Sequence, residues 1–447
     1  GSARAGSLCF GMVRERVQAK SPGARAGAPD RTDEPQISAP RPRKFVVQLA
    51  AVVLTFFALA FATGILPVTD TWAQKPLKSV ARRAAAGAVE FAVYPNGATP
   101  ADQPLKIFAA SVAEIVKGVS SEGFGGMSGN LTVWTVDGEL RNGDAVFAKA
   151  HSKGPTNVYV APAGRPFQWP AHKLGERIPV RGLDRQISLE ALSAVPRVFL
   201  VHNFMSAEEV AMMQEFAYSQ ENPHRMKPSS VGKETADELR EKSSTRTSEN
   251  AWDVQSPMYH LMMNRSFGLL RMAHDWNTFD GIQVVRYRPG EAYIVHSDTF
   301  PVVPDNSHNW DPSSGGTNRY VTIFMYMNDV AEDEGGQTVF PLARDTVQPS
   351  DDVRHTHEKA TEIRSSALTK GKELFGDPGR WEYKLTEQCY SSYSLRPRAM
   401  SAAMFYHQHP LTGTILPEAQ HGACPVLGGE KWGANMWIWN GPRYWSR

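Results

Sequence analysis

Two residues in the C-terminal half have the types and spacing of metal ligands. His296 and Asp298 stand two apart in a segment, 291–298, that alternates between apolar and polar side chains. In a β-strand, residues i and i+2 project from the same face, so this imidazole and this carboxylate would point into one interior. A His-x-Asp pair alone is common by chance, and the simpler interpretation of His296 is a hydrogen-bonded core histidine.

A third ligand and a cation follow on later segments. His421, in a Gln-His-Gly-Ala-Cys-Pro-Val run, would complete the face of two histidines and one carboxylate that leaves open positions on Fe(II). Lys431 stands at the start of an aromatic strand. A buried lysine there could pair with the distal carboxylate of 2-oxoglutarate, whereas the alternative is a solvated surface lysine.

The order of the motifs resembles the prolyl 4-hydroxylase family. The motifs are Tyr293-x-x-His-x-Asp298, Arg319-Tyr-Val-Thr-Ile-Phe-Met-Tyr-Met-Asn-Asp329, Gly335-Gly-Gln-Thr-Val-Phe-Pro341, His421-Gly-Ala-Cys-Pro-Val426 and Lys431-Trp432, and the similarity extends back through Arg246-Thr-Ser248. The resemblance implies the cofactors Fe(II), 2-oxoglutarate and ascorbate. It implies that iron is bound by His296, Asp298 and His421, and that 2-oxoglutarate is anchored by Lys431 in a pocket lined by Tyr287 and Thr338.

The resemblance also indicates residues near the substrate and a cysteine pair. The substrate positions match Tyr293, Arg246, Ser248, Asp280 and Arg319, with Asp280 standing where glutamate is more usual. Trp439 occupies a position where the family often carries histidine, so the orientation or preference for substrate is expected to differ. The family's cysteine pair, which can form a disulfide, falls on Cys389 and Cys424.

The activity implied by the resemblance is hydroxylation of peptidyl proline to 4-hydroxyproline, with O2 and 2-oxoglutarate consumed and succinate and CO2 released. Proline-rich or hydroxyproline-type polypeptides suit this chemistry because polyproline II is preformed and its carbonyls are unpaired. Three alternatives stay open: a non-catalytic membrane protein that binds proline-rich peptides, a zinc hydrolase with the same ligands, and a soluble oxygen-sensing hydroxylase.

The elements that must position these residues begin near Pro196. A strand-like run precedes Ser206-Ala-Glu-Glu209, which has capping-box spacing, and Ser256-Pro257 opens a second helical stretch reaching about Trp276. Short strands are predicted at 282–287, 293–298, 319–327, 338–340, 402–406 and 432–439. The pattern predicts an all-β core with flanking helices (α+β), a double-stranded β-helix or jelly roll, over residues 196–445.

The N-terminal part carries a candidate membrane anchor. Residues 1–43 lack apolar periodicity and are predicted to be a disordered basic cytosolic tail. Residues 45–66 are apolar enough to span about 30 Å of hydrocarbon as a transmembrane signal anchor, with cations crowding the N-terminal edge. A cleaved signal peptide is the alternative. Residues 67–195 would then form a lumenal stem or small β-rich module.

This topology predicts a location. A single-pass type II protein would hold its catalytic domain in the lumen of the endoplasmic reticulum or Golgi, where the sequons at Asn130 and Asn264 could be glycosylated. A net charge of +2 on 447 residues argues against nucleic acid as a partner. The polar stretch 345–387 is an insertion relative to many members of the family that the motifs resemble.

Overall fold

The computed structural model describes residues 88–443, apart from 123, 125–126, 128, 149–153, 230–244, 303–316 and 353–354. The chain divides into two units, Gly1–Ala73 and Gln74–Arg447, and all described residues belong to the second. The predicted tail 1–43 and membrane span 45–66 lie outside the described residues. Among the helices of the described part, none is long and apolar enough to cross a bilayer.

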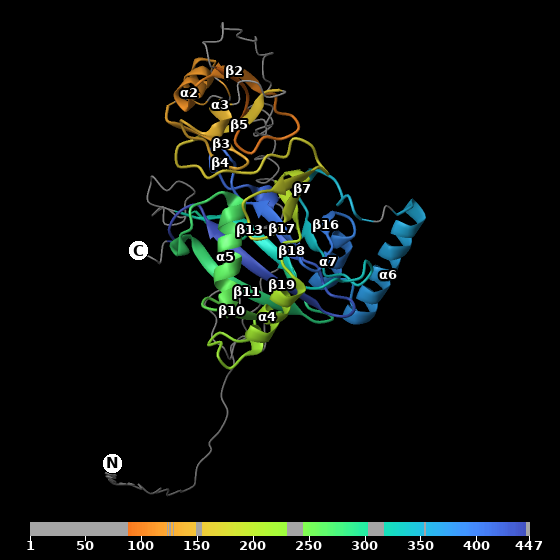
Figure 1. Cartoon of the computed structure of the whole chain (residues 1–447). Helices are drawn as coiled ribbons and strands as arrows, with labels where there is room; N and C mark the ends of the chain where they lie inside the picture. Colours follow the sequence, from red (N-terminus) through yellow and green to blue (C-terminus); the bar gives the residue numbers. More distant parts are fainter. Residues whose placement is uncertain are drawn as a thin grey trace, which may run out of the picture. The chain divides into compact units, whose positions relative to one another are not determined.

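Two sheets face each other around a shared core (Figure 1). The larger comprises β6 Arg177–Val180, β7 Ile187–Val195, β8 Val198–His202, β9 Lys227–Pro228, β10 Glu249–Asp253, β11 Phe279–Tyr287, β13 Arg319–Tyr326, β15 Arg344–Thr346, β17 Ser401–Tyr406 and β19 Lys431–Trp439. Its order is β15-β7-β8-β17-β13-β19-β11-β10-β9, with β6 beside β7. The smaller, in the order β12-β18-β14-β16, comprises β12 Tyr293–His296, β18 His421–Ala423, β14 Thr338–Phe340 and β16 Tyr393–Leu395. The predicted all-β core is confirmed.

Strand alternation gives the large sheet two different faces, because successive side chains in a strand point to opposite sides. In β13, Phe324 and Tyr326 face the small sheet and pack with Phe340 of β14. Ile323 and Met325, which alternate with them, face a second, larger core. That second face is covered by helices α4 Ala207–Tyr218 and α5 Pro257–Leu270, as the ribbon shows for α5 (Figure 1).

The two helices begin where the sequence predicts, but the second is shorter. Ser206 and Glu209 form the predicted capping box at the start of α4, and Ser256 caps α5. The prediction that the second helix reaches about residue 276 is wrong. The helix ends at Leu270 because the next residue, Arg271, adopts a left-handed backbone conformation with φ of 57°. The side chain of Arg271 also makes a tertiary contact there, since its Nε donates to the Val136 carbonyl at 2.8 Å.

The sandwich begins earlier than the predicted domain boundary at residue 196. β6 and β7 belong to the large sheet, and β7 pairs with β8 in a register that sets Ser188 opposite His202. Trp169 is fully buried in the second core, and its Nε1 donates to the Leu269 carbonyl at 2.7 Å. These contacts show that the sandwich includes the segment from about Phe167 onward. The sequence placed the boundary too late because strand pairing depends on partners that are distant in the chain.

Residues 89–162 form a small module with a sheet and a hydrophobic core of its own. A five-stranded sheet has the order β2-β1-β5-β3-β4, in which only β1 and β5 are parallel, and helix α2 Val112–Ser121 follows the second strand and packs on one face. The strands are β1 Val89–Pro95, β2 Leu105–Ala109, β3 Leu131–Thr135, β4 Gly138–Glu139 and β5 Thr156–Pro162, and a short helix α3 Ala145–Ala148 precedes β5.

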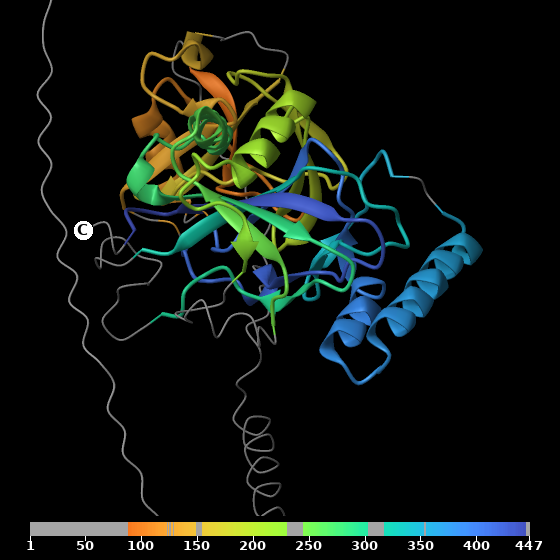
Figure 2. The ribbon, with the colours of Figure 1, turned by 90° about the horizontal axis from the view of Figure 1, so that it is seen from below.

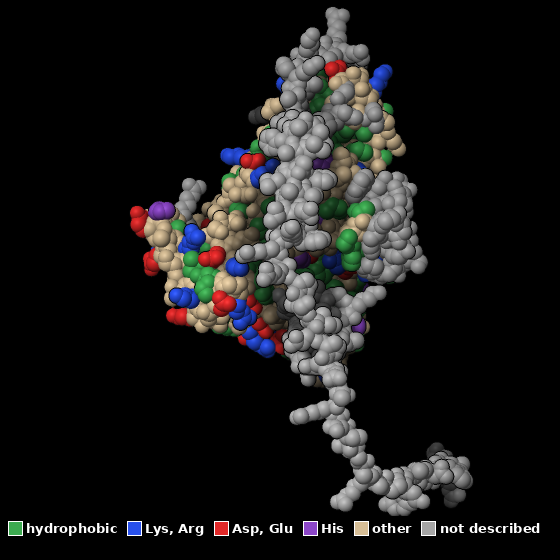
Figure 3. All heavy atoms as spheres, turned by 180° about the vertical axis from the view of Figure 1, so that it is seen from behind, with side chains coloured by type: hydrophobic (Ala, Val, Ile, Leu, Met, Phe, Trp, Pro, Cys, Tyr) green, Lys and Arg blue, Asp and Glu red, His purple; other side chains and the backbone are tan. Residues whose placement is uncertain are grey.

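The polar insertion 345–387 contains most of a helical pair at the edge of the sandwich (Figures 1 and 2). The helices are α6 His357–Phe375 and α7 Trp381–Cys389. Acidic and basic side chains are intermixed on this side of the molecule (Figure 3), and they include the ion pair between Lys370 and Asp333 at 2.7 Å. The insertion therefore presents a solvated, charged surface, while a disulfide between Cys389 and Cys424 ties α7 to the segment after β18.

Candidate active site

The three predicted metal ligands come together between the two sheets. His296 ends β12 and His421 begins β18, and the antiparallel register pairs these two residues directly. Asp298 lies two residues beyond His296, as the alternation of the strand predicts. One ligand atom from each of the three residues lies within 4.8 Å of the others. Direct cross-strand pairing is what places side chains this close.

The hydrogen bonds of both histidines leave their metal-binding nitrogens available. Nδ1 of His296 donates to the Ile294 carbonyl at 2.8 Å, and Nδ1 of His421 donates to the Ala419 carbonyl at 3.1 Å. Each Nε2 then carries a lone pair, and these atoms lie 3.6 and 3.5 Å from the Asp298 carboxylate oxygens. These nitrogens and carboxylate oxygens are all hydrogen-bond acceptors, and a bound cation would explain why they face one another without a proton between them. An imidazole whose other nitrogen donates a hydrogen bond to the protein is typical of metal sites.

Burial keeps this set of groups in its metal-binding form. Burial lowers the pKa of His421 to about 4, so the imidazole is neutral at physiological pH. Burial alone would raise the pKa of Asp298, but the facing histidines, His421 first, hold it well below its ordinary value. The site therefore offers two imidazoles and one carboxylate, the donor set suited to Fe(II) with open positions.

Two further residues contact Asp298, and sequence reasoning missed both. The Thr322 hydroxyl donates to Asp298 Oδ2 at 2.7 Å, and His407 Nε2 lies 2.6 Å from the same hydroxyl oxygen. Strand alternation is the signal that could have found them. Thr322 shares a face with Phe324 in β13, and His407 shares one with Phe405 just beyond the end of β17.

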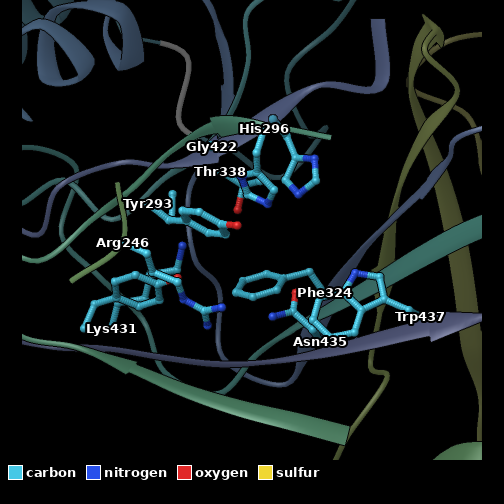
Figure 4. A pocket seen from close by; sticks show the side chains of 12 residues that line it. Arg246, Tyr293, His296, Phe324, Thr338, Gly422, Lys431, Asn435 and Trp437 are labelled. Atoms are coloured by element: carbon cyan, nitrogen blue, oxygen red, sulfur yellow. The ribbon is translucent and has the colours of Figure 1, made fainter. Parts of the chain in front are cut away.

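A pocket connects the metal ligands to Lys431. In the close view His296, Thr338 and Gly422 lie toward one end, Lys431 and Arg246 lie toward the other, and Tyr293 lies between (Figure 4). Its walls come from both sheets. The pocket is lined by Arg246, Tyr287, Tyr293, His296, Phe324, Thr338, His421, Gly422, Ala423, Lys431, Asn435 and Trp437.

Lys431 is a buried ammonium group without a hydrogen-bond partner among the described residues. Its Nζ lies 5.0 Å from the ring centre of Phe324 and 5.5 Å from that of Tyr287, so aromatic faces surround it. Burial lowers its pKa to about 7. A buried cation that lacks a counter-ion costs free energy, and a carboxylate entering the pocket would remove that cost. The predicted surface alternative for this lysine is therefore wrong.

The other residues predicted for the co-substrate also lie at the pocket. The hydroxyl of Tyr326 donates to Thr338 Oγ1 at 2.9 Å, which orients the threonine beside the metal ligands. Tyr287 is buried beside Lys431, and burial raises the pKa of its phenol, which stays neutral. Both residues line the pocket.

Of the residues predicted near the substrate, three lie at or beside this pocket. The Tyr293 ring stacks on His296 with ring centres 3.7 Å apart, and the Arg246 guanidinium lies 5.0 Å from the centre of the same ring. Arg246 Nε donates to the Ser248 hydroxyl at 3.0 Å, so Ser248 holds the arginine in place. Both Tyr293 and Arg246 line the pocket, Tyr293 between its two ends and Arg246 toward the end that holds Lys431 (Figure 4).

Asp280, Arg319 and Trp439 form a separate cluster. Trp439 is fully buried, and its Nε1 donates to Asp280 Oδ1 at 2.9 Å. Arg319 Nη2 pairs with the other Asp280 oxygen at 2.8 Å. Arg319 Nη1 donates to the Asp298 backbone carbonyl at 3.0 Å. The indole of Trp439 packs against Phe300 and does not line the pocket, and its contact with substrate stays a prediction.

The remaining predicted residues are on the surface or in the disulfide. Asn130 lies directly before β3, Asn264 lies on α5, and both side chains are exposed. Cys389 and Cys424 form a disulfide with Cα atoms 6.1 Å apart.

Comparison with known proteins identifies the superfamily and the family of this chain. The model of the 2OG-Fe(II) oxygenase superfamily matches residues 282–439, the span that holds the metal ligands and Lys431. "Probable prolyl 4-hydroxylase 3" of Arabidopsis thaliana is 30% identical over 251 residues, covering 56% of this chain and 71% of that protein. "Probable prolyl 4-hydroxylase 7" of the same plant is 27% identical over 247 residues, covering 55% of this chain and 64% of that protein. The chain belongs to the prolyl 4-hydroxylase family, which confirms the resemblance.

A solved structure is also similar to part of the chain. It is the 2OG complex of viral collagen prolyl hydroxylase from Paramecium bursaria Chlorella virus-1, with 18% sequence identity and a TM-score of 0.32, and the alignment covers 54% of this chain and 95% of that one.

Proposed function

We propose that this chain hydroxylates peptidyl proline to 4-hydroxyproline, with iron held by His296, Asp298 and His421 and 2-oxoglutarate held by Lys431. One observation carries the proposal: a single pocket is lined by two of the three facing metal ligands, His296 and His421, and by the buried ammonium group of Lys431, which has no hydrogen-bond partner among the described residues (Figure 4). Bound Fe(II) and 2-oxoglutarate supply oxidation by O2, with succinate and CO2 as products. Ascorbate completes the cofactor set of the family.

The protein's own side chains bind and orient the reactants. Lys431 pairs with the distal carboxylate of the co-substrate, and Phe324 and Tyr287 keep water away from that ion pair, which strengthens it. Tyr293 and Arg246 also line the pocket, and an extended proline-rich peptide can contact them once the co-substrate fills the space between Lys431 and the metal ligands. The aromatic ring of Tyr293 suits the pyrrolidine of proline, and the guanidinium suits the peptide carbonyls.

The test is a peptide hydroxylation assay with the purified full-length chain, Fe(II), ascorbate and 2-oxoglutarate. We expect mass spectrometry to find one added oxygen on proline residues of proline-rich peptides, with succinate formed in equal amount. Labelled O2 should transfer its label to the peptide. A metal-loaded protein that releases no succinate with any such peptide would favour the non-catalytic peptide-binding alternative.

We also propose that the catalytic domain faces the lumen of the endoplasmic reticulum or Golgi. The Cys389–Cys424 disulfide supports an oxidising compartment, and the apolar run at 45–66, with cations before it, supports an N-terminal anchor. On intact microsomes, the domain should resist added protease and become sensitive when detergent opens the membrane. Digestion without detergent would contradict this topology.

The affinity for 2-oxoglutarate should fall as pH rises above about 7. A carboxylate pairs with the ammonium form of Lys431, whose pKa burial lowers to about 7 in the free protein. Above that pH, binding must take up a proton, which costs roughly tenfold in affinity per pH unit until the pKa of Lys431 in the complex is reached. Calorimetry in buffers of different ionisation enthalpy measures the proton uptake. 2-Oxobutanoate, which lacks the distal carboxylate, should show no such uptake and is the control.

A further inference from the structure

A fourth histidine lies one layer behind the metal ligands. His407 is fully buried just after β17, and its backbone N–H donates to the Tyr320 carbonyl at 2.9 Å, which extends the pairing with β13. Its Nε2 lies 2.6 Å from Thr322 Oγ1 and 3.7 Å from Asp298 Oδ2. Thr322 Oγ1 lies 2.7 Å from the same carboxylate oxygen. The threonine hydroxyl therefore stands between the imidazole and the carboxylate.

Counting hydrogens fixes the direction of this chain of contacts. A threonine hydroxyl has one hydrogen, and an ionised carboxylate can only accept, so Thr322 donates to Asp298. The hydroxyl oxygen must then accept from His407 Nε2, which therefore carries a proton. His407 has the opposite tautomer from His296 and His421, whose Nδ1 atoms are the donors. In this state its Nε2 has no lone pair for a metal.

We propose that His407 is a positioning residue that holds the carboxylate ligand Asp298 through the hydroxyl of Thr322. Two aligned hydrogen bonds fix the rotation of the threonine side chain and, through it, the plane of the carboxylate. Without the imidazole donor, the buried hydroxyl loses the contact that orients it and is free to turn away from Asp298. The inference rests on the metal site proposed above, because a positioning role requires that Asp298 bind the metal.

The geometry argues against His407 as a fourth ligand. Its ring centre lies 6.5 Å from that of His421, whereas the rings of His296 and His421 lie 4.6 Å apart. His407 is also absent from the group whose ligand atoms all approach within 4.8 Å. Partners of metal ligands are known to change metal affinity by about 10–100-fold when removed, so a role one layer behind the metal is large enough to measure.

The test measures Co(II) binding to the full-length, metal-free chain by the visible spectrum of the bound ion, without any turnover. Thr322→Val keeps the shape of the side chain and removes the hydroxyl, while His407→Leu removes the imidazole donor. Each should weaken Co(II) binding about tenfold or more. Thr322→Ser and His407→Gln keep a hydroxyl and a donor and should retain most of the affinity. Thr386→Val, which removes a buried hydroxyl of α7, should leave Co(II) binding unchanged.

The double variant gives the sharpest outcome. If His407 acts through Thr322, adding His407→Leu to Thr322→Val weakens binding no further, because the relay is already broken. Independent, multiplying losses would overturn the relay and favour direct ligation. Unchanged Co(II) affinity in both single variants, with lowered thermal stability, would show a purely structural role. A wild-type chain that binds no Co(II) would instead contradict the metal site itself.

Discussion

Replacing any one of His296, Asp298 and His421 by alanine is expected to abolish turnover. Each residue supplies one of three ligand atoms that lie within 4.8 Å of one another, and no other group of three or more His, Cys, Asp or Glu residues in the described part of the chain is arranged this way. Since removing only an outer partner of a ligand costs about 10–100-fold, loss of a ligand itself should exceed about a hundredfold in metal affinity.

The measurement is metal content after dialysis together with succinate release at saturating 2-oxoglutarate. His357→Ala is the matched control, because His357 is exposed at the start of α6 and should leave both quantities unchanged. A variant of His296, Asp298 or His421 that retains iron and near-normal turnover would remove that residue from the site. A zinc hydrolase would lose its activity with these variants too, so dependence on 2-oxoglutarate must be recorded in the wild type.

The second large effect is expected at Lys431, which should set the affinity for 2-oxoglutarate and not for iron. An ammonium has no lone pair for a metal but pairs strongly with a carboxylate in a sheltered pocket. In Lys431→Ala the distal carboxylate of 2-oxoglutarate would enter an aromatic pocket that no longer holds the ammonium group with which it pairs. The cost of several kcal/mol for such a buried charge corresponds to a rise of at least about a hundredfold in the 2-oxoglutarate requirement.

Lys431→Arg tests the geometry separately. The guanidinium keeps the charge but is longer and forked, and Phe324, Tyr287 and Tyr326 leave it little freedom, so it should restore only part of the affinity. Lys372→Ala, on the exposed side of α6, is the control for loss of a lysine. Equal rises in the iron and 2-oxoglutarate requirements, or no rise in either, would show that Lys431 is not the anchor.

The sequence by itself determined the local features that depend on neighbouring residues. Three such features can be read from the amino-acid sequence alone: the two-residue spacing of His296 and Asp298 in a strand, the capping box at Ser206 and the motif that carries Lys431. Each follows from a short-range rule: alternate side chains of a strand share a face, and a serine oxygen satisfies the free N–H groups of the helix that follows. The order of these motifs was enough to find the family.

The tertiary structure alone decided which of these features meet. The register that sets His296 opposite His421, the addition of β7 to the large sheet and the burial of Trp439 on Asp280 all depend on segments far apart in the chain. Thr322 and His407 looked like ordinary strand residues until the pairing of β13 with β17 brought both to Asp298. Periodicity fixes the face on which a side chain lies, but the choice of strand partner is non-local, and that choice made these residues part of the site.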